Sequence, residues 1–190
     1  MKKITIALIM VISLIAPIQT MAESVTQNGT IIEPLEQNIE QIIDEITSEP
    51  RPINSDAIQN VKEHISEYFG NLGYDKIEYQ KFEYNDENNE NAIRHSSQAD
   101  VFLASTAENA IVDGIGENII VTKNSSIDTT KNLIISAHYD SAEDSVGAND
   151  NGSGVAAVLE LARILKDTEI PYNIKFILFS GEEKYMLGSR

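Results

Sequence analysis

One histidine and four acidic residues in the second half of the chain are of the types that hold a catalytic metal ion. His138 and Asp140 lie two residues apart, Asp150 lies in a glycine-rich stretch, and Glu182 and Glu183 are adjacent. Catalytic zinc is bound by histidine nitrogen and carboxylate oxygen and keeps one position open for water. The set therefore predicts a hydrolytic zinc site.

The spacing gives these side chains different possible tasks. His138 can supply a nitrogen ligand, and Asp140 can orient its imidazole from behind. Asp150 lies within the run Gly147–Gly154, whose glycines allow a tight loop close to an ion. A carboxylate in such a loop can bridge two cations, and two zinc ions close together would activate one water.

The adjacent residues Glu182 and Glu183 can have two different roles. Neighbouring side chains in an extended backbone point in opposite directions. We therefore expect one carboxylate to bind metal and the other to remain free. A free carboxylate beside the attacking water can take its proton and later give it to the leaving amine.

Two short apolar runs must position these groups. Residues 133–137 lead directly to His138, and residues 174–179 lead to Glu182, with apolar residues at helical spacing over 154–165 between them. A strand, a helix and a second strand form a βαβ unit, which brings both carboxyl ends to one edge of a parallel sheet. The run 133–137, which is apolar except for Ser136, predicts a central strand buried on both faces.

The preceding half of the chain predicts helices and further strands of an α/β fold. One helix is expected over residues 35–47 and a second from Ser55, as its cap, to an exit at Gly70 and Gly73. His64 is expected within the second helix, beside its apolar stripe, as a surface or boundary histidine, and His95 is expected to be exposed, neither as a ligand. Strands are predicted at 77–84, 101–104, 110–112 and 118–122.

The amino terminus has the pattern of a secretory signal. Lys2 and Lys3 precede an apolar run, and Ala22 offers a small residue for cleavage. We therefore divide the chain into a signal peptide (1–22), a leader or first helix (23–50) and a catalytic-type domain (51–190). We expect the protein to be secreted to the extracellular space, with no membrane attachment after the signal peptide is cleaved.

Composition excludes several classes of site. The chain has no cysteine, which excludes disulfides, thiolate zinc fingers and cysteine nucleophiles. Fourteen basic against thirty acidic residues give a net charge of −16. Because nucleic acids and anionic membranes require basic patches, neither is an expected partner.

Three motifs also carry a resemblance. Residues 137–141 (AHYDS), 147–154 (GANDNGSG) and 180–183 (SGEE) with 187–189 (LGS) resemble the secreted di-zinc aminopeptidase family of clan MH metallopeptidases. That group also includes glutamate carboxypeptidase-like enzymes and glutaminyl cyclases. Weaker similarity extends back to about Arg51. The resemblance implies a mixed, mostly parallel sheet between helix layers.

The resemblance also implies a role for each site residue. His138 binds one zinc ion, Asp150 bridges two, and Glu183 binds the second. Glu182 is the general acid and base, and Asp140 supports His138. The family completes its site with one more Asp and one more His downstream of the Glu-Glu motif. We therefore expect this chain to be the N-terminal part of the domain, truncated at its C-terminal end, with weak metal binding and little activity by itself.

These observations predict a secreted zinc exopeptidase, most simply an aminopeptidase, acting on peptides or proteins with a free N-terminus. Two alternatives stay open. One is a truncated, non-catalytic secreted relative, serving as a binding module or representing a pseudogene product. The other is a glutaminyl-cyclase-like enzyme of the same fold.

Overall fold

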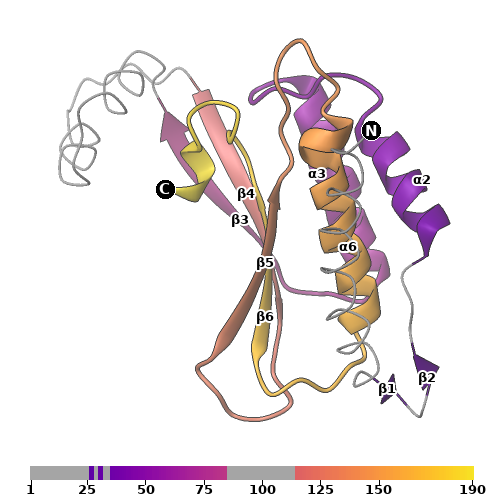
Figure 1. Ribbon diagram of the computed structural model, residues 1–190. Coiled ribbons are helices and arrows are strands. Elements are labelled where there is room, and N and C mark those ends of the chain that lie inside the picture. Colours follow the sequence, from indigo (N-terminus) through magenta and orange to yellow (C-terminus); the bar gives the residue numbers. More distant parts are fainter. Residues whose placement is uncertain (1–25, 28–29, 32–34, 85–113) are drawn as a thin grey trace, which may run out of the picture.

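The computed structural model describes residues 26–27, 30–31, 35–84 and 114–190. They form an α/β fold in which helices pack against a four-stranded sheet of order β3-β4-β6-β5 (Figure 1). A separate antiparallel pair, β1 with β2, precedes the first helix. The elements in chain order are β1 (Thr26–Gln27), β2 (Thr30–Ile31), α2 (Glu36–Ile46), α3 (Asp56–Asn71), β3 (Ile77–Tyr84), β4 (Gly114–Lys123), β5 (Asn132–His138), the short turn η1 (Ala148–Gly152), α6 (Ser153–Leu165), β6 (Asn173–Phe179) and the single turn η2 (Leu187–Ser189).

The sheet is mixed, but it is not mostly parallel as predicted. β5 and β6 pair in parallel, whereas β4 pairs antiparallel with both β3 and β6. Parallel neighbours need a long crossover connection, and α6 provides it between β5 and β6. The predicted βαβ unit is therefore confirmed, whereas the prediction of a mostly parallel sheet was wrong.

The prediction that residues 133–137 form a central strand was also wrong. β5 is the last strand in the order of the described sheet. Leu133 is 46% exposed and Ile134 is 58% exposed, whereas Ala137 is buried. A short apolar run cannot by itself distinguish a strand covered on both faces from one that leaves a face open.

The core lies between the sheet and its helices. In the described residues, α2, α3 and α6 all lie on one side of the sheet (Figure 1), whereas helix layers on both sides were expected. β6 alternates between buried and half-buried side chains, as a strand with one covered face should. The side chains that meet in this core include Ile65, Phe69, Ile119, Val121, Val155, Leu159, Ile174, Phe176 and Leu178.

Local sequence signals account for the helices. The Ser55 side chain accepts a hydrogen bond from the backbone N–H of Ile58 at 3.1 Å, which caps α3 as predicted. Gly73 has a φ of 87°, a left-handed conformation that glycine adopts at low cost, and it ends the segment after α3. Gly70 instead remains within the helix.

A buried carboxylate on α6 holds the start of α2. Glu160 Oε1 accepts the backbone N–H of Leu35 at 2.8 Å, and Oε2 accepts from the Asn38 side chain at 2.9 Å. Arg163 donates to both oxygens, at 2.9 and 2.7 Å. Burial acts to raise the pKa of Glu160, but these hydrogen bonds outweigh it and hold the pKa below its ordinary value. α2 is thus attached to α6 by a charged link as well as by Ile42 and Ile46 in the core.

Several predictions fall outside the described residues. These are the signal peptide at 1–22, the strands at 101–104 and 110–112, and the position of His95. Among the helices that are described, none has the length and apolar character needed to cross a membrane.

Candidate metal centre

The parallel pairing of β5 and β6 brings the predicted site residues to one edge of the sheet. His138, the last residue of β5, is in register with Phe179, the last residue of β6. The backbone N–H of Tyr139 donates to the carbonyl of Phe179 at 2.9 Å, which extends the pairing past His138. The segment after β6 turns immediately and carries Glu182 and Glu183 to the same edge (yellow in Figure 1).

Three side chains converge there closely enough to share one ion. One ligand atom from each of His138, Glu182 and Glu183 lies within 4.8 Å of the other two. His138 Nε2 is 3.7 Å from a carboxylate oxygen of Glu182 and 3.0 Å from Oδ1 of Asp150. The structure thus brings three predicted carboxylates, those of Asp150, Glu182 and Glu183, around the imidazole of His138.

The two adjacent glutamates do not point apart. The expected divergence rested on an extended backbone, whereas the chain forms a turn at these residues. The backbone N–H of Met186 donates to the carbonyl of Glu182 at 2.8 Å, and that of Leu187 donates to Gly181. This turn lets both carboxylates face His138.

Asp140 makes its hydrogen bonds to the glutamate turn. Its Oδ1 accepts the backbone N–H of Glu182 and its Oδ2 accepts that of Glu183, each at 3.1 Å. The same Oδ1 lies 3.4 Å from His138 Nδ1. That contact lacks hydrogen-bond geometry, so the buried Nδ1 atom has no hydrogen-bond partner among the described residues. Asp140 is therefore placed beside the imidazole, as predicted, and also holds the glutamate turn.

The electrostatics of the cluster favour a cation. Burial acts to lower the pKa of His138, but the adjacent carboxylate of Asp140, the charge of Glu182 and a hydrogen bond to Asp150 raise that pKa to about 9. The pKa of Glu183 is raised by its burial and then by the nearby charge of Asp150. An imidazole among carboxylates that repel one another is a donor set that fits Zn²⁺.

Asp150 approaches from a loop that requires glycine. Its side chain is 77% exposed. Gly147, at the start of the loop, has a φ of 58°, and a Cβ there would lie 2.5 Å from the carbonyl oxygen of Asp150. The loop closes through a hydrogen bond of 2.8 Å from the Gly152 N–H to the Gly147 carbonyl. The prediction that glycine permits a tight loop here is confirmed at Gly147.

Sequence reasoning missed two buried residues that hold this region together. Arg51 is fully buried and donates to backbone carbonyls on either side of the site. Asn118, on β4, accepts the N–H of Ser180 at 3.0 Å and donates to the carbonyl of Gly188 at 2.7 Å, so it spans the glutamate turn. Neither residue has periodicity or a motif that reveals such contacts. The only signal was that the family resemblance reaches back to about Arg51.

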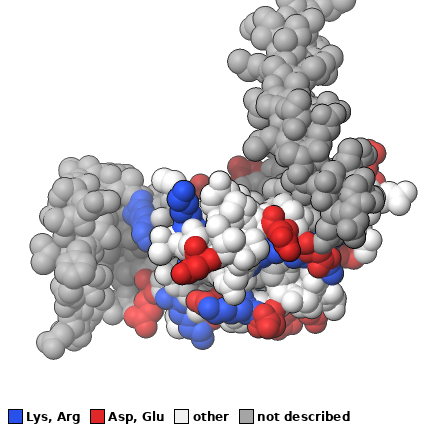
Figure 2. Space-filling view, turned by 90° about the horizontal axis from the view of Figure 1, so that it is seen from below, with Lys and Arg blue, Asp and Glu red and all other residues white. Residues whose placement is uncertain are grey.

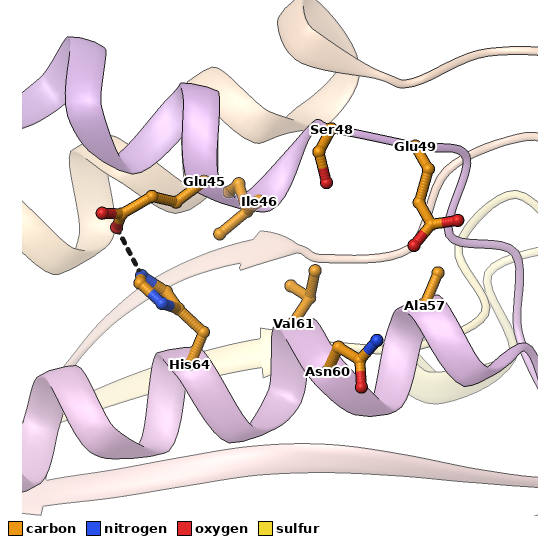
Figure 3. A pocket seen from close by; sticks show the side chains of 8 residues that line it. All are labelled: Glu45, Ile46, Ser48, Glu49, Ala57, Asn60, Val61 and His64. Atoms are coloured by element: carbon orange, nitrogen blue, oxygen red, sulfur yellow. Dashed lines mark ion pairs between the residues drawn. The ribbon is translucent and has the colours of Figure 1, made fainter.

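A hollow elsewhere on the surface contains none of the predicted site residues. It lies between α2 and α3 and is lined by Glu45, Ile46, Ser48, Glu49, Ala57, Asn60, Val61 and His64 (Figure 3). His64 Nε2 points to Glu45 and lies 3.1 Å from its carboxylate. His64 therefore pairs across two helices, as a boundary histidine would, away from the metal cluster.

The excess of acidic over basic residues in the chain is not evident on every face of the molecule. Figure 2 shows the end of the molecule that lies at the bottom of Figure 1, where acidic and basic side chains are interleaved. The carboxylates around His138 instead gather at the ends of β5 and β6.

Comparison of the sequence with known proteins relates this region to peptidases. The profile of Peptidase family M28 matches residues 118–190. "Aminopeptidase YwaD" of Bacillus subtilis is 43% identical over 81 residues, which are 42% of this chain and 18% of that protein. A "Vacuolar membrane protease" of Schizosaccharomyces japonicus is 31% identical over 148 residues, which are 78% of this chain and 16% of that protein. The chain thus spans less than a fifth of the length of these relatives.

The fold is also found in solved structures. The zinc aminopeptidase BSAP from Bacillus subtilis superposes with a TM-score of 0.63 at 19% identity, covering 80% of this chain and 63% of that one. The glutaminyl cyclase of Porphyromonas gingivalis superposes with a TM-score of 0.58 at 18% identity, covering 77% and 45% of the two chains. The segment that matches the family profile contains every residue of the cluster, and the fold agrees with that of a zinc aminopeptidase over part of its length. Residues 118–190 belong to peptidase family M28 and carry part of the domain of that family.

Proposed function

We propose that this chain is the N-terminal part of a secreted zinc aminopeptidase that hydrolyses peptides from a free N-terminus. The observation that carries the proposal is the convergence of His138, Glu182 and Glu183 within 4.8 Å, with Asp150 at 3.0 Å from the same imidazole. A nitrogen ligand surrounded by carboxylates at the carboxyl ends of parallel strands is a suitable site for metal-assisted hydrolysis.

The residues take the following roles in this proposal. His138, Asp150 and Glu183 would hold zinc, with two ions expected in the complete enzyme. Bound zinc would acidify a water molecule and polarise the scissile carbonyl. Asp140 keeps the glutamate turn in place through the two backbone N–H groups that it accepts. The resemblance implies two further ligands, one Asp and one His, downstream of the Glu-Glu motif and beyond residue 190.

Glu182 is suited to moving the proton. Its side chain is 39% exposed, so it can exchange protons with solvent, and its carboxylate lies within reach of the cluster. In the reaction it would take a proton from the attacking water and pass it to the amine that leaves. The resemblance assigns the other glutamate, Glu183, as the ligand, and its carboxylate lies in the same cluster.

The test is the Glu182→Gln variant of the full-length protein. We expect hydrolysis of an aminoacyl substrate to fall by roughly 10²- to 10⁴-fold, because general acid–base catalysis contributes about that much. Zinc content should be unchanged. Glu143→Gln, an exposed acidic residue in the loop after β5, is the matched control and should retain full activity. Unchanged turnover in Glu182→Gln would contradict the assigned role.

A glutaminyl-cyclase-like reaction is the second candidate, because the fold also superposes on cyclases. Presenting the same preparation with an aminoacyl substrate and with a peptide that begins with glutamine separates the two reactions. Zinc binding without either reaction would instead support a non-catalytic relative.

Secretion is part of the proposal and rests on the pattern of residues 1–22. The exported protein should begin near Glu23. Amino-terminal sequencing of protein recovered from the culture medium checks this, and a protein that stays with the cells and retains residues 1–22 would contradict it.

A further inference from the structure

A buried arginine lies beside the metal centre without a carboxylate partner. Arg51, in the segment between α2 and α3, is fully buried. Among the described residues, no carboxylate oxygen lies within ion-pair distance of its guanidinium. Burial lowers the pKa of Arg51, and the charges of Asp140 and Glu183 act in the opposite direction. A cation placed in this way must be compensated mainly by hydrogen bonds.

The guanidinium is satisfied by backbone carbonyls from two different segments. Nε donates to the carbonyl of Tyr139 at 2.7 Å, in the residue that follows His138. Nη1 donates to the carbonyl of Val146, and Nη2 donates to that of Gly147 at 3.1 Å. The first acceptor belongs to the end of β5, and the other two belong to the loop that carries Asp150.

The backbone of Arg51 is fixed to the same region. Its N–H donates to the Ser141 hydroxyl at 3.0 Å, and its carbonyl accepts the N–H of Ser141 at 3.2 Å. Gly147 packs closely on this arrangement, since a Cβ there would lie 3.4 Å from Nη1 of Arg51 and 2.8 Å from Cβ of Ser141. The guanidinium is therefore anchored at its own backbone and spans a fixed gap.

We propose that Arg51 is a positioning residue of the metal centre, which fixes the loop bearing Asp150 against the strand end bearing His138. This inference rests on the proposed function, since it assigns Arg51 to the geometry of the proposed zinc site. Asp150, whose side chain is 77% exposed, reaches the imidazole at 3.0 Å from this loop. The fork of Arg51 ties the loop to the residue after β5, together with a hydrogen bond of 2.8 Å from the Ser141 hydroxyl to the Ser145 carbonyl. A lysine has a single ammonium and cannot reproduce a planar fork directed at three carbonyls.

A purely structural arginine offers the matched control. Arg163 is bound through its guanidinium to the buried Glu160 on α6 and contacts none of the site residues through that fork. Replacing either arginine by lysine removes a multidentate interaction of a partly or fully buried guanidinium. Only Arg51→Lys should change the metal site.

The experiment compares Arg51→Lys, Arg163→Lys and the full-length wild type well below their unfolding temperatures. The first measurement is zinc affinity by competition with a chelator. The second is amide hydrogen exchange over residues 147–154, where the Gly152 N–H closes the loop. We expect Arg51→Lys to weaken zinc binding by about 10- to 100-fold, the range typical when the supports of metal ligands are altered. We also expect faster exchange in the loop, while Arg163→Lys changes neither.

Equal affinity and equal exchange in the two variants would overturn the proposal. If the wild type bound no zinc, the proposed function would fail. The role of Arg51 would then be decided only by amide hydrogen exchange over residues 147–154. Faster exchange in Arg51→Lys only would then support it as the residue that fixes the loop, and equal exchange would reject it. If Arg51→Lys failed to fold, Arg51→Gln would be subjected to the same two measurements.

Discussion

Asp140 accepts the backbone N–H of Glu183 at 3.1 Å, although 43 residues separate the two in sequence. Its second oxygen accepts the N–H of Glu182 at the same distance. One carboxylate at the end of β5 therefore sets the position of the whole turn after β6. Because Asp140 also lies beside His138, one side chain contacts both the imidazole and the glutamate turn.

Replacement of Asp140 by Asn should weaken metal binding. An amide has only one acceptor oxygen, so one of the two backbone N–H groups loses its partner and the turn loosens. We expect zinc affinity to fall by about 10- to 100-fold, as for other residues that support metal ligands. Competition with a chelator measures this, and Asp144→Asn, in the exposed loop after β5, is the control. Wild-type affinity in Asp140→Asn would show that the turn holds without this clamp.

Replacement of Asn118 by Ala should destabilise the segment that carries the glutamates. The buried Asn118 accepts the N–H of Ser180 and donates to the carbonyl of Gly188, and the variant leaves both groups without this partner. Because an unsatisfied buried polar group costs about 1–3 kcal/mol, the free energy of unfolding should fall by about that amount. Urea denaturation provides the measurement. Gln80→Ala removes only the exposed partner of Asn118 and should have little effect.

The contribution of Glu160 to stability should depend on pH. Its pKa in the folded protein lies below the ordinary value, so the stabilisation is present above the unfolded pKa, about 4.3, and is lost as the pH falls through the folded pKa. Relative to Glu160→Gln, the wild type should be more stable by about 1.5–3 kcal/mol near neutral pH, in the range of hydrogen bonds to charged groups. The difference should shrink below about pH 4.

Urea denaturation from pH 3 to pH 7 checks this behaviour. Glu169→Gln, at an exposed position after α6, is the control and should follow the wild type throughout. A Glu160→Gln deficit that stays constant down to pH 3 would mean that the carboxylate charge is not the source of the stabilisation.

Zinc should raise the unfolding temperature of the metal-free, full-length protein. A ligand that binds only the folded state stabilises it by about 2.7 kcal/mol when its concentration is 100 times Kd. His138→Ala removes the nitrogen around which the cluster gathers, so zinc should raise its unfolding temperature by less than that of the wild type. Differential scanning fluorimetry with and without a chelator tests this. An equal shift in the variant would place the bound zinc elsewhere.

Local patterns were sufficient to predict the helices and the arrival of the site residues at one sheet edge. Ser55 identified the start of α3, and the alternating burial of β6 follows from its apolar residues. The proximity of His138 to Glu182 followed from two strands joined by a helix, since a crossover connection forces parallel pairing. These inferences use only neighbours in sequence or one connecting element.

The remainder depended on contacts between distant residues. The strand order and the exposed position of β5 are set by pairing, which apolar runs do not encode. The turn at Glu182 is imposed by Asp140, 42 residues earlier, and the fork of Arg51 reaches residues 88 to 96 positions away. The prediction that Glu182 and Glu183 lie in an extended backbone was wrong, because no neighbouring residue in the sequence indicates the turn.

The attachment of α2 to α6 also sets the order in which the nascent chain can assemble. Leu35 and its acceptor on Glu160 are 125 residues apart. At about 5–20 residues per second, the ribosome needs roughly 6–25 s to synthesise the intervening chain. Until then, the amphipathic face of α2 has no α6 to pack on. α2 can therefore dock on α6 only after that interval, and its apolar stripe is not covered by α6 until then.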